Sequence, residues 1–167
     1  MSKALPFPLI ILLASVAGLS SCTQEGDLTS RRSEVSEVIT QLLVAYETED
    51  IGLLSRIVVQ NDNIIFFGTG ASEHYSGWDS WKSSQTEKWG MDQKIRITST
   101  DLKVFIPENG HIAWFTDVEH WHLIGEEDSI NANRVRVSGI LEKRRGTWKI
   151  VQIHFSIPDG TTTDKMQ

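Results

Sequence analysis

Two runs near the end of the chain alternate between apolar and polar residues and are separated by only two residues. The runs cover residues 135–144 and 147–158, and Arg145 and Gly146 stand between them. Alternation with a period of two is typical of a strand whose faces differ, and a two-residue connection that contains glycine is typical of a β-hairpin. The sequence therefore predicts an antiparallel hairpin here, so the fold must contain a sheet.

Helical patterns fill much of the first half of the chain. Apolar residues recur at steps of three and four from Val35 to Tyr46, which predicts a long helix that begins near Ser33. A shorter helix is predicted between Asp50 and the turn that begins at Asn61. The other expected elements are a third helix at 77–90 and strands at 64–67, 74–75, 94–106, 111–124, 131–144 and 147–157.

The beginning of the chain has the pattern of an export signal. Lys3 precedes a run from Leu5 to Leu19 that contains no charged residue. A helix of this length rises only about 22 Å, which is too short to span a hydrocarbon core of about 30 Å. We therefore expect a cleaved signal peptide at residues 1–21 and no membrane-spanning anchor.

The end of this signal resembles a bacterial lipobox. Leu19-Ser20-Ser21-Cys22 places small residues before the only cysteine of the chain. The resemblance implies that Cys22 is diacylated and becomes the new N-terminus of an exported, membrane-anchored lipoprotein, and secretion without a lipid is the alternative. In a host with two membranes, Thr23 after the cysteine implies the periplasmic face of the outer membrane.

The mature chain is expected to form one domain. Removal of residues 1–21 from the 167-residue chain leaves 146 residues, a length typical of a single core. Residues 22–32 are mostly polar, so we expect a flexible tether, followed by the domain at 33–158 and a polar tail at 159–167. The net charge is −6 and the basic residues are scattered apart from Lys143-Arg144-Arg145, so nucleic acid is not an expected partner.

Three segments together resemble SnoaL-like domains of the nuclear transport factor 2-like superfamily. They are Phe66-Phe67-Gly68-Thr69-Gly70, Glu73-His74-Tyr75-Ser76-Gly77-Trp78 and the final strand from Trp148 to Pro158, and the resemblance covers about residues 33–158. It implies a cone-shaped α+β fold, also called cystatin-like, in which three N-terminal helices pack on a strongly curved, mixed, mainly antiparallel sheet. Members range from isomerases and cyclases to inert assembly modules, so the resemblance predicts a fold and a pocket but no reaction.

Alternation in the strands predicts which side chains face that pocket. If Arg145 and Gly146 form the turn, His154 and Gln152 share a face with Val137, and we interpret this face as the concave one. The predicted ligand-binding residues are Trp114, Thr116, His120, Gln152, His154, Trp148, Tyr75 and Trp81, with Tyr46 and Trp89 as further wall candidates. Such a mixture suits a small, partly aromatic ligand. The alternative is that the tryptophans are core residues and His154 is a structural histidine.

The same alternation predicts an outer face that is more apolar than a solvated surface should be. Asp117 and Glu119 are expected on this face, opposite two arginines of the next strand. The convex sheet face commonly forms a dimer in the superfamily, so the resemblance implies a homodimer. The predicted interface residues are Val151, Ile153, Phe155, Arg134 and Arg136.

His154 is the predicted catalytic residue if the domain is an enzyme, because an imidazole can act as acid or base near neutral pH. Asp117 is the alternative base, since a register shift of one residue would turn it toward the pocket. The ketosteroid isomerases of the superfamily use an aspartate and a tyrosine, and these positions correspond to Phe67 and Leu42. Neither residue can transfer a proton, so that chemistry is not expected here.

A metal site is also not expected. His120 and His122 share a strand face, but the predicted register places His120 and His154 roughly 16 Å apart. Zinc ligands lie about 2.1 Å from the metal, so these side chains cannot share one ion. No other cofactor is expected.

Three functions remain open from the sequence. The favoured function is a lipid-anchored domain that binds a small, partly apolar molecule in its pocket or acts as a dimeric assembly module. The alternative is an isomerase, cyclase or hydratase that needs no cofactor and uses His154 or Asp117 as acid or base. The third is a purely structural dimer in the cell envelope, in which the tryptophans fill their own pocket.

Overall fold

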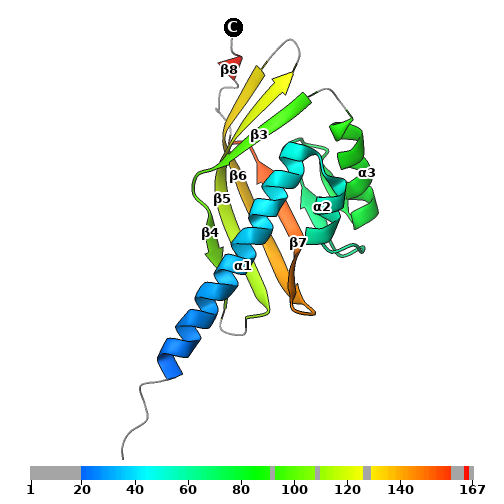
Figure 1. Cartoon of the computed structure of the whole chain (residues 1–167). Helices are drawn as coiled ribbons and strands as arrows, with labels where there is room; N and C mark the ends of the chain where they lie inside the picture. The colour runs from blue at the N-terminus through cyan, green and yellow to red at the C-terminus, as the bar shows by residue number, and fades with distance from the viewer. Residues whose placement is uncertain (1–19, 91–92, 108–109, 126–128, 159–163, 166–167) are drawn as a thin grey trace, which may run out of the picture.

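Three helices cover one face of a single sheet (Figure 1). The structure is a computed structural model that describes residues 20–90, 93–107, 110–125, 129–158 and 164–165. The helices are α1 (Ser20–Thr48), α2 (Ile51–Ile57) and α3 (Trp78–Trp89). The predicted α+β class, with three helices on a mixed, mainly antiparallel sheet, is confirmed.

The sheet has the strand order β2-β1-β7-β6-β5-β3, and β4 and β8 pair with β5 and β6, respectively. Only the pair of β1 and β7 is parallel among the described strands. The strands are β1 (Ile65–Phe67), β2 (His74–Ser76), β3 (Gln93–Ser99), β4 (Lys103–Phe105), β5 (Ile112–Gly125), β6 (Ser129–Arg144), β7 (Thr147–Ser156) and β8 (Asp164–Lys165). The predicted hairpin is therefore the pair of β6 and β7.

The helices pack against the sheet through apolar side chains on one side of each helix. In α1, Val35, Ile39 and Leu42 recur at helical spacing and are almost completely buried in one core with the sheet. α2 begins where Asp50 caps it, because the Asp50 side chain accepts a hydrogen bond from Leu53 N at 2.8 Å. The regularly spaced apolar residues that predicted these helices are thus the residues that are buried.

α1 begins earlier than expected. The segment predicted to be a flexible tether is helical from Ser20, and its Asp27 and Arg31 form an ion pair at 2.5 Å one helical turn apart. The first turns of α1 extend beyond the sheet (Figure 1). Residues 1–19 of the predicted signal peptide and most of the predicted tail lie outside the described residues. None of the described helices is long and apolar enough to cross a membrane.

The turn of the β6–β7 hairpin fixes α1 against the sheet. Glu34 of α1 accepts hydrogen bonds from Lys143 Nζ at 2.7 Å and from Trp148 Nε1 at 2.9 Å. Trp148 is buried, and Lys143 lies over its ring at 5.5 Å from the ring centre. This contact joins residues that are more than a hundred positions apart in the chain.

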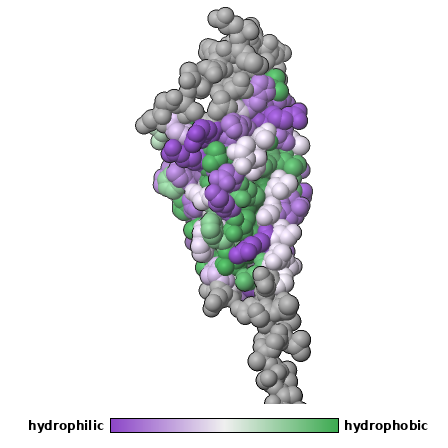
Figure 2. Space-filling model, turned by 90° about the vertical axis from the view of Figure 1, so that its left-hand side faces the viewer, coloured by the Kyte–Doolittle hydropathy of each residue, from purple (hydrophilic) through white to green (hydrophobic). Residues whose placement is uncertain are grey.

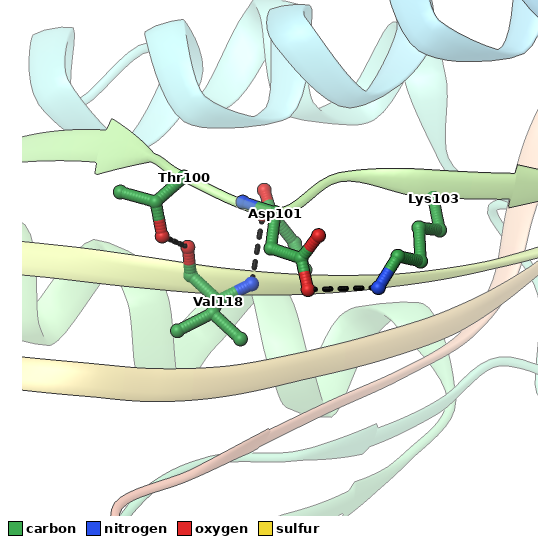
Figure 3. Close-up of polar contacts among 5 residues, drawn as sticks. Thr100, Asp101, Lys103 and Val118 are labelled. Carbon is green, nitrogen blue, oxygen red and sulfur yellow. Dashed lines mark hydrogen bonds and ion pairs between the residues drawn. The ribbon is translucent and has the colours of Figure 1, made fainter.

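The single strand predicted at 94–106 is interrupted. It forms β3 and β4, which both pair with β5, and the break falls at Thr100 and Asp101. Thr100 donates from its backbone and its hydroxyl to Val118 O, at 2.9 and 2.5 Å (Figure 3). Asp101 in turn pairs with Lys103 at 2.9 Å. Side-chain bonds of this kind compete with a regular ladder, which explains the break.

The predicted register of the hairpin is wrong beyond its first few pairs. Leu141 pairs with Ile150 as expected, but Ile140 pairs with Gln152, so Val151 is an extra residue in β7. Such a bulge reverses the faces of all residues that follow it. Ile153 and Phe155 therefore lie in the core and not on a dimer interface, whereas His154 is exposed on the outer face.

The predicted register of β5 against β6 is also wrong by one residue. Asp117 pairs with Val137 and Glu119 with Val135, so neither carboxylate lies opposite an arginine. Both acidic side chains are instead buried on the face that the helices cover, at 2% and 1% exposure. This reversal moves the candidate site to a different set of residues.

Candidate functional site

A cavity of about 300 Å³ lies between the end of α1, α3 and the inner face of the sheet. Helices, strands and the β1–β2 loop all contribute to its wall. The lining residues are Tyr46, Phe66, Gly68, Thr69, Glu73, Gln85, Lys88, Trp89, Ile95, Trp121, Leu123 and Phe155. Its size is at the lower end of the range for small-molecule pockets.

Aromatic rings make up much of this wall. Tyr46 contacts Trp89 edge to face, with ring centres 5.6 Å apart and an interplanar angle of 85°. Phe155 lies 5.8 Å from Tyr46 and 5.4 Å from Trp121, in tilted arrangements. These contacts hold the rings at fixed angles to one another, which is typical of packed aromatic clusters.

Behind the wall lies one buried carboxyl group, that of Glu119. Trp121 Nε1 donates to Glu119 Oε2 at 2.6 Å, and the other carboxyl oxygen has no hydrogen-bond partner among the described residues. Burial raises the pKa of Glu119 from 4.5 to about 7, a shift that Trp121 opposes and the nearby Asp117 carboxylate reinforces. Glu119 can therefore exchange a proton near neutral pH.

Two further polar groups near this carboxyl group are buried. Tyr46 Oη and Trp81 Nε1 have no partner of good hydrogen-bond geometry in the part of the chain that is described. Burial raises the pKa of Tyr46 above its ordinary value; the Trp81 indole opposes this rise, and the charges of Glu73 and Glu119 add to it. Tyr46 therefore stays protonated and neutral at ordinary pH.

The rim of the cavity carries an ion pair. Lys88 of α3 pairs with Glu73, which also accepts a hydrogen bond from Gly70 N at 3.0 Å. Burial alone would raise the pKa of Glu73, but the hydrogen bonds from Lys88, Gly70 and Thr69 outweigh it and hold the pKa below its ordinary value. The Glu73 carboxylate would collide with a side chain at position 68, so Gly68 has a steric reason to be glycine.

Asp117, the predicted alternative base, lies on the inner face but does not line the cavity. Its Oδ1 accepts hydrogen bonds from Val118 N at 2.7 Å and from Asp101 N at 3.2 Å, at the break between β3 and β4. These contacts give Asp117 a structural role at the break.

None of the eight predicted ligand-binding residues lines the cavity. Trp114, at 43% exposure, Thr116, His120 and His154 are exposed on the outer face, and Gln152 is half-buried there. Trp81 and Trp148 are core residues, and Tyr75 packs against the core through Phe66. Of the further wall candidates, Tyr46 and Trp89 do line the cavity. In the predicted dimer interface, Ile153 and Phe155 are buried, Val151 is half-buried, and only Arg134 and Arg136 are exposed.

Sequence reasoning did not name Trp121, Phe66 or Gln85 as site residues, and it expected Glu119 on the outer face together with Asp117. Trp121 and Glu119 alternate with Asp117, so one correct pairing of β5 would have placed all three on the inner face. Gln85 is buried one turn after Trp81 on α3, and this spacing was visible in the sequence. No group of three or more His, Cys, Asp or Glu side chains that could hold a metal ion occurs in the described ranges.

Comparison with known families identifies the domain. The family model of the SnoaL-like domain matches residues 35–160. The chain belongs to the SnoaL-like family. The matched range covers α1 from Val35 onward, the other two helices, strands β1 to β7 and the cavity, so the SnoaL-like domain accounts for most of the described structure.

Solved structures with the same fold have little sequence in common with this SnoaL-like chain. A nuclear transport factor 2-like superfamily protein from Salmonella enterica serovar Typhimurium is 17% identical with a TM-score of 0.68, over 81% of this chain and 96% of that one. A hexachlorocyclohexane dehydrochlorinase of type 2 is 15% identical with a TM-score of 0.69, over 86% and 93%. No curated protein matches the chain. The structural similarity therefore establishes the fold alone.

Proposed function

We propose that this SnoaL-like domain binds a small, partly apolar molecule in the cavity between α1, α3 and the sheet. The observation that supports this proposal is the wall itself, in which aromatic rings surround about 300 Å³ and a few polar groups are placed among them. Ligand sites are commonly apolar cavities with a small number of positioned polar groups. A core built only for stability would be expected to fill such a space.

The proposal includes the cellular address that the N-terminal sequence predicts. After export, a diacyl group on Cys22 would hold the domain at a membrane, on the periplasmic face of the outer membrane in a host with two membranes. The helical segment before Glu34 would then separate the domain from the lipid. Labelling with a radioactive fatty acid, compared between the natural chain and Cys22→Ala, tests this part.

We also propose a homodimer that forms through the outer face of the sheet. The observed register changes which residues are expected in its interface. Phe105, Trp114 and Ile140 are exposed neighbours across three strands, and the rings of Phe105 and Trp114 stack at 5.7 Å. Figure 2 looks onto the side where β4 and β5 lie and shows a band of apolar residues between polar ones. Exposed apolar patches of this kind often mark protein interfaces.

A second candidate function is proton transfer by Glu119, without a cofactor. The specific observation in its favour is a buried carboxyl group with one free oxygen and a pKa of about 7 next to the cavity. The fold is compatible with catalysis, since a dehydrochlorinase shares it. Glu119 stands behind Trp121 and is not in the wall, so binding is the better-supported function.

The melting temperature of the full chain in the presence of small-molecule libraries tests the proposed binding, because a ligand of the native state raises it. In the variant Ile95→Trp, a larger side chain would occupy the cavity, so we expect the stabilisation by every ligand to disappear. Ile112→Trp, at an exposed position of the outer face, is the matched control and should keep it. Equal stabilisation of both variants by the same ligands would contradict the proposal.

A further inference from the structure

We propose that the cavity selects a small organic cation, such as a quaternary or tertiary ammonium group, over neutral and anionic molecules of the same shape. This inference rests on the proposed binding function and specifies the chemical class of its ligand. It is carried by the rings that line the cavity together with the unpartnered carboxyl oxygen behind them.

The aromatic part of the wall suits a cation. Tyr46, Phe66, Trp89, Trp121 and Phe155 all line the cavity, and four of the ring pairs among them have centres 5.4–5.8 Å apart. The face of an aromatic ring carries negative electrostatic potential, and a cation within about 6 Å of the ring centre is attracted to it. In a cavity of about 300 Å³, a bound ammonium group would lie close to several of these rings. Aromatic cages recognise alkylated ammonium groups in this way.

The charges around the cavity also favour a cation. Glu119 Oε1 has no hydrogen-bond partner in the described structure, and Trp121, which lines the cavity, donates a hydrogen bond to the other oxygen of this carboxyl group. Among the described residues that line the cavity, Lys88 is the only basic one, and its charge is paired with that of Glu73. An anion would therefore meet no unpaired positive charge on the described wall residues, whereas a cation would lie near the carboxylate that is bonded to Trp121.

A neutral apolar ligand would use the same rings without the charge, so the test must vary charge at constant shape. Choline and 3,3-dimethylbutan-1-ol meet this need, because a carbon atom replaces the nitrogen and the hydroxyl group is retained. Their affinities for the full chain, extracted in mild detergent, are measured by calorimetry or ligand-detected NMR at pH 8. We expect choline to bind at least about tenfold more tightly.

Two variants separate the two sources of selectivity. Glu119→Gln keeps the size of the side chain and removes its charge, so the preference for choline should fall severalfold while the affinity for the neutral alcohol stays unchanged. Trp89→Leu removes one ring of the wall at a half-buried position and should also reduce the preference. Trp114→Leu removes a tryptophan from the outer face and should leave both affinities unaltered.

The possible outcomes distinguish the two proposals. Equal affinity for choline and the alcohol, abolished in Ile95→Trp, would overturn the cationic class and leave the cavity as a binding site. Binding of choline that persists in Ile95→Trp would place the cation elsewhere and overturn the inference as well. Failure of choline to bind while neutral molecules from the library do would also overturn it. A preference for choline that both Glu119→Gln and Trp89→Leu reduce would support it.

Discussion

Glu119 is a buried carboxyl group with a raised pKa and one oxygen that has no hydrogen-bond partner among the described residues. Its neighbours on the inner face of β5 are an acid and a tryptophan, and only the tryptophan donates a hydrogen bond to it. A buried carboxyl group with one free oxygen costs stability whenever it is ionised. Natural domains keep such costly groups mostly at functional sites, which agrees with its position behind the cavity wall.

This cost has a predictable pH dependence. The pKa of Glu119 rises from 4.5 to about 7 on folding, so the unfolded chain binds fewer protons between these values. The stability contributed by the protonated group is complete below about pH 4.5 and is lost as the pH rises through about 7. In urea unfolding at pH 8, we expect Glu119→Gln to be more stable than the natural chain by about 1 to 3 kcal/mol.

The difference between the two chains should vanish near pH 4. A control is Glu37→Gln, at an exposed position of α1, which should change neither the stability nor its pH dependence. If the stability of Glu119→Gln depends on pH in the same way as that of the natural chain, Glu119 ionises in the folded protein without a loss of stability.

Gly139 lies where β6 passes close to two neighbours. A Cβ atom at this position would lie 2.5 Å from Phe115 Cε1 and 2.9 Å from Gln152 O, both closer than contact distances allow. We expect Gly139→Ala to lower the free energy of unfolding by about 1 to 3 kcal/mol, because neither the buried ring nor the backbone can move freely. Ser138→Ala, at the next position on the outer face, is the control for chemical denaturation and should cost much less.

At the scale of elements, most of the helices and strands could be predicted, because their signals are local. Helical spacing marked α1, and the Arg145-Gly146 turn marked the hairpin. The site could not be predicted, because it depends on the pairing of β5 with β6 and on the extra residue Val151, and nothing in the alternation of β7 reveals where a bulge falls. Because of the extra residue Val151, Phe155 lies on the inner face of the sheet and His154 on the outer face, which is the reverse of the prediction.

The contact between α1 and the hairpin turn should also be measurable. Glu34→Ala removes the acceptor of both Lys143 and Trp148, so we expect a loss of about 1 kcal/mol in stability. Amide hydrogens of residues 26–34 should exchange faster in this variant, because the N-terminal part of α1 is released from the hairpin. Glu37→Ala, whose carboxylate bonds only to Gln41 on the same helix, should show neither effect. Unchanged exchange in Glu34→Ala would show that packing alone fixes α1.

At the scale of the whole molecule, the sheet separates two surfaces with different proposed roles. Its inner face encloses the cavity, and its outer face presents Trp114 and Ile140 to solvent. We expect Ile140→Lys to convert the proposed dimer into a monomer in light scattering after size exclusion, because a charge in a dry interface is costly. Thr40→Lys on the exposed side of α1 should leave the dimer intact. A natural chain that is already monomeric would contradict the proposed interface.

The most direct test of the account is native mass spectrometry of the full chain, produced in a bacterial expression host and purified in mild detergent. A molecule that binds in the cavity should remain attached as an adduct of constant mass, and it should be missing from the Ile95→Trp variant purified in the same way. Retention of the adduct in Ile112→Trp would confirm that the loss is specific to the cavity. If the natural chain and Ile95→Trp carry the same adduct in the same amount, the cavity is not the binding site.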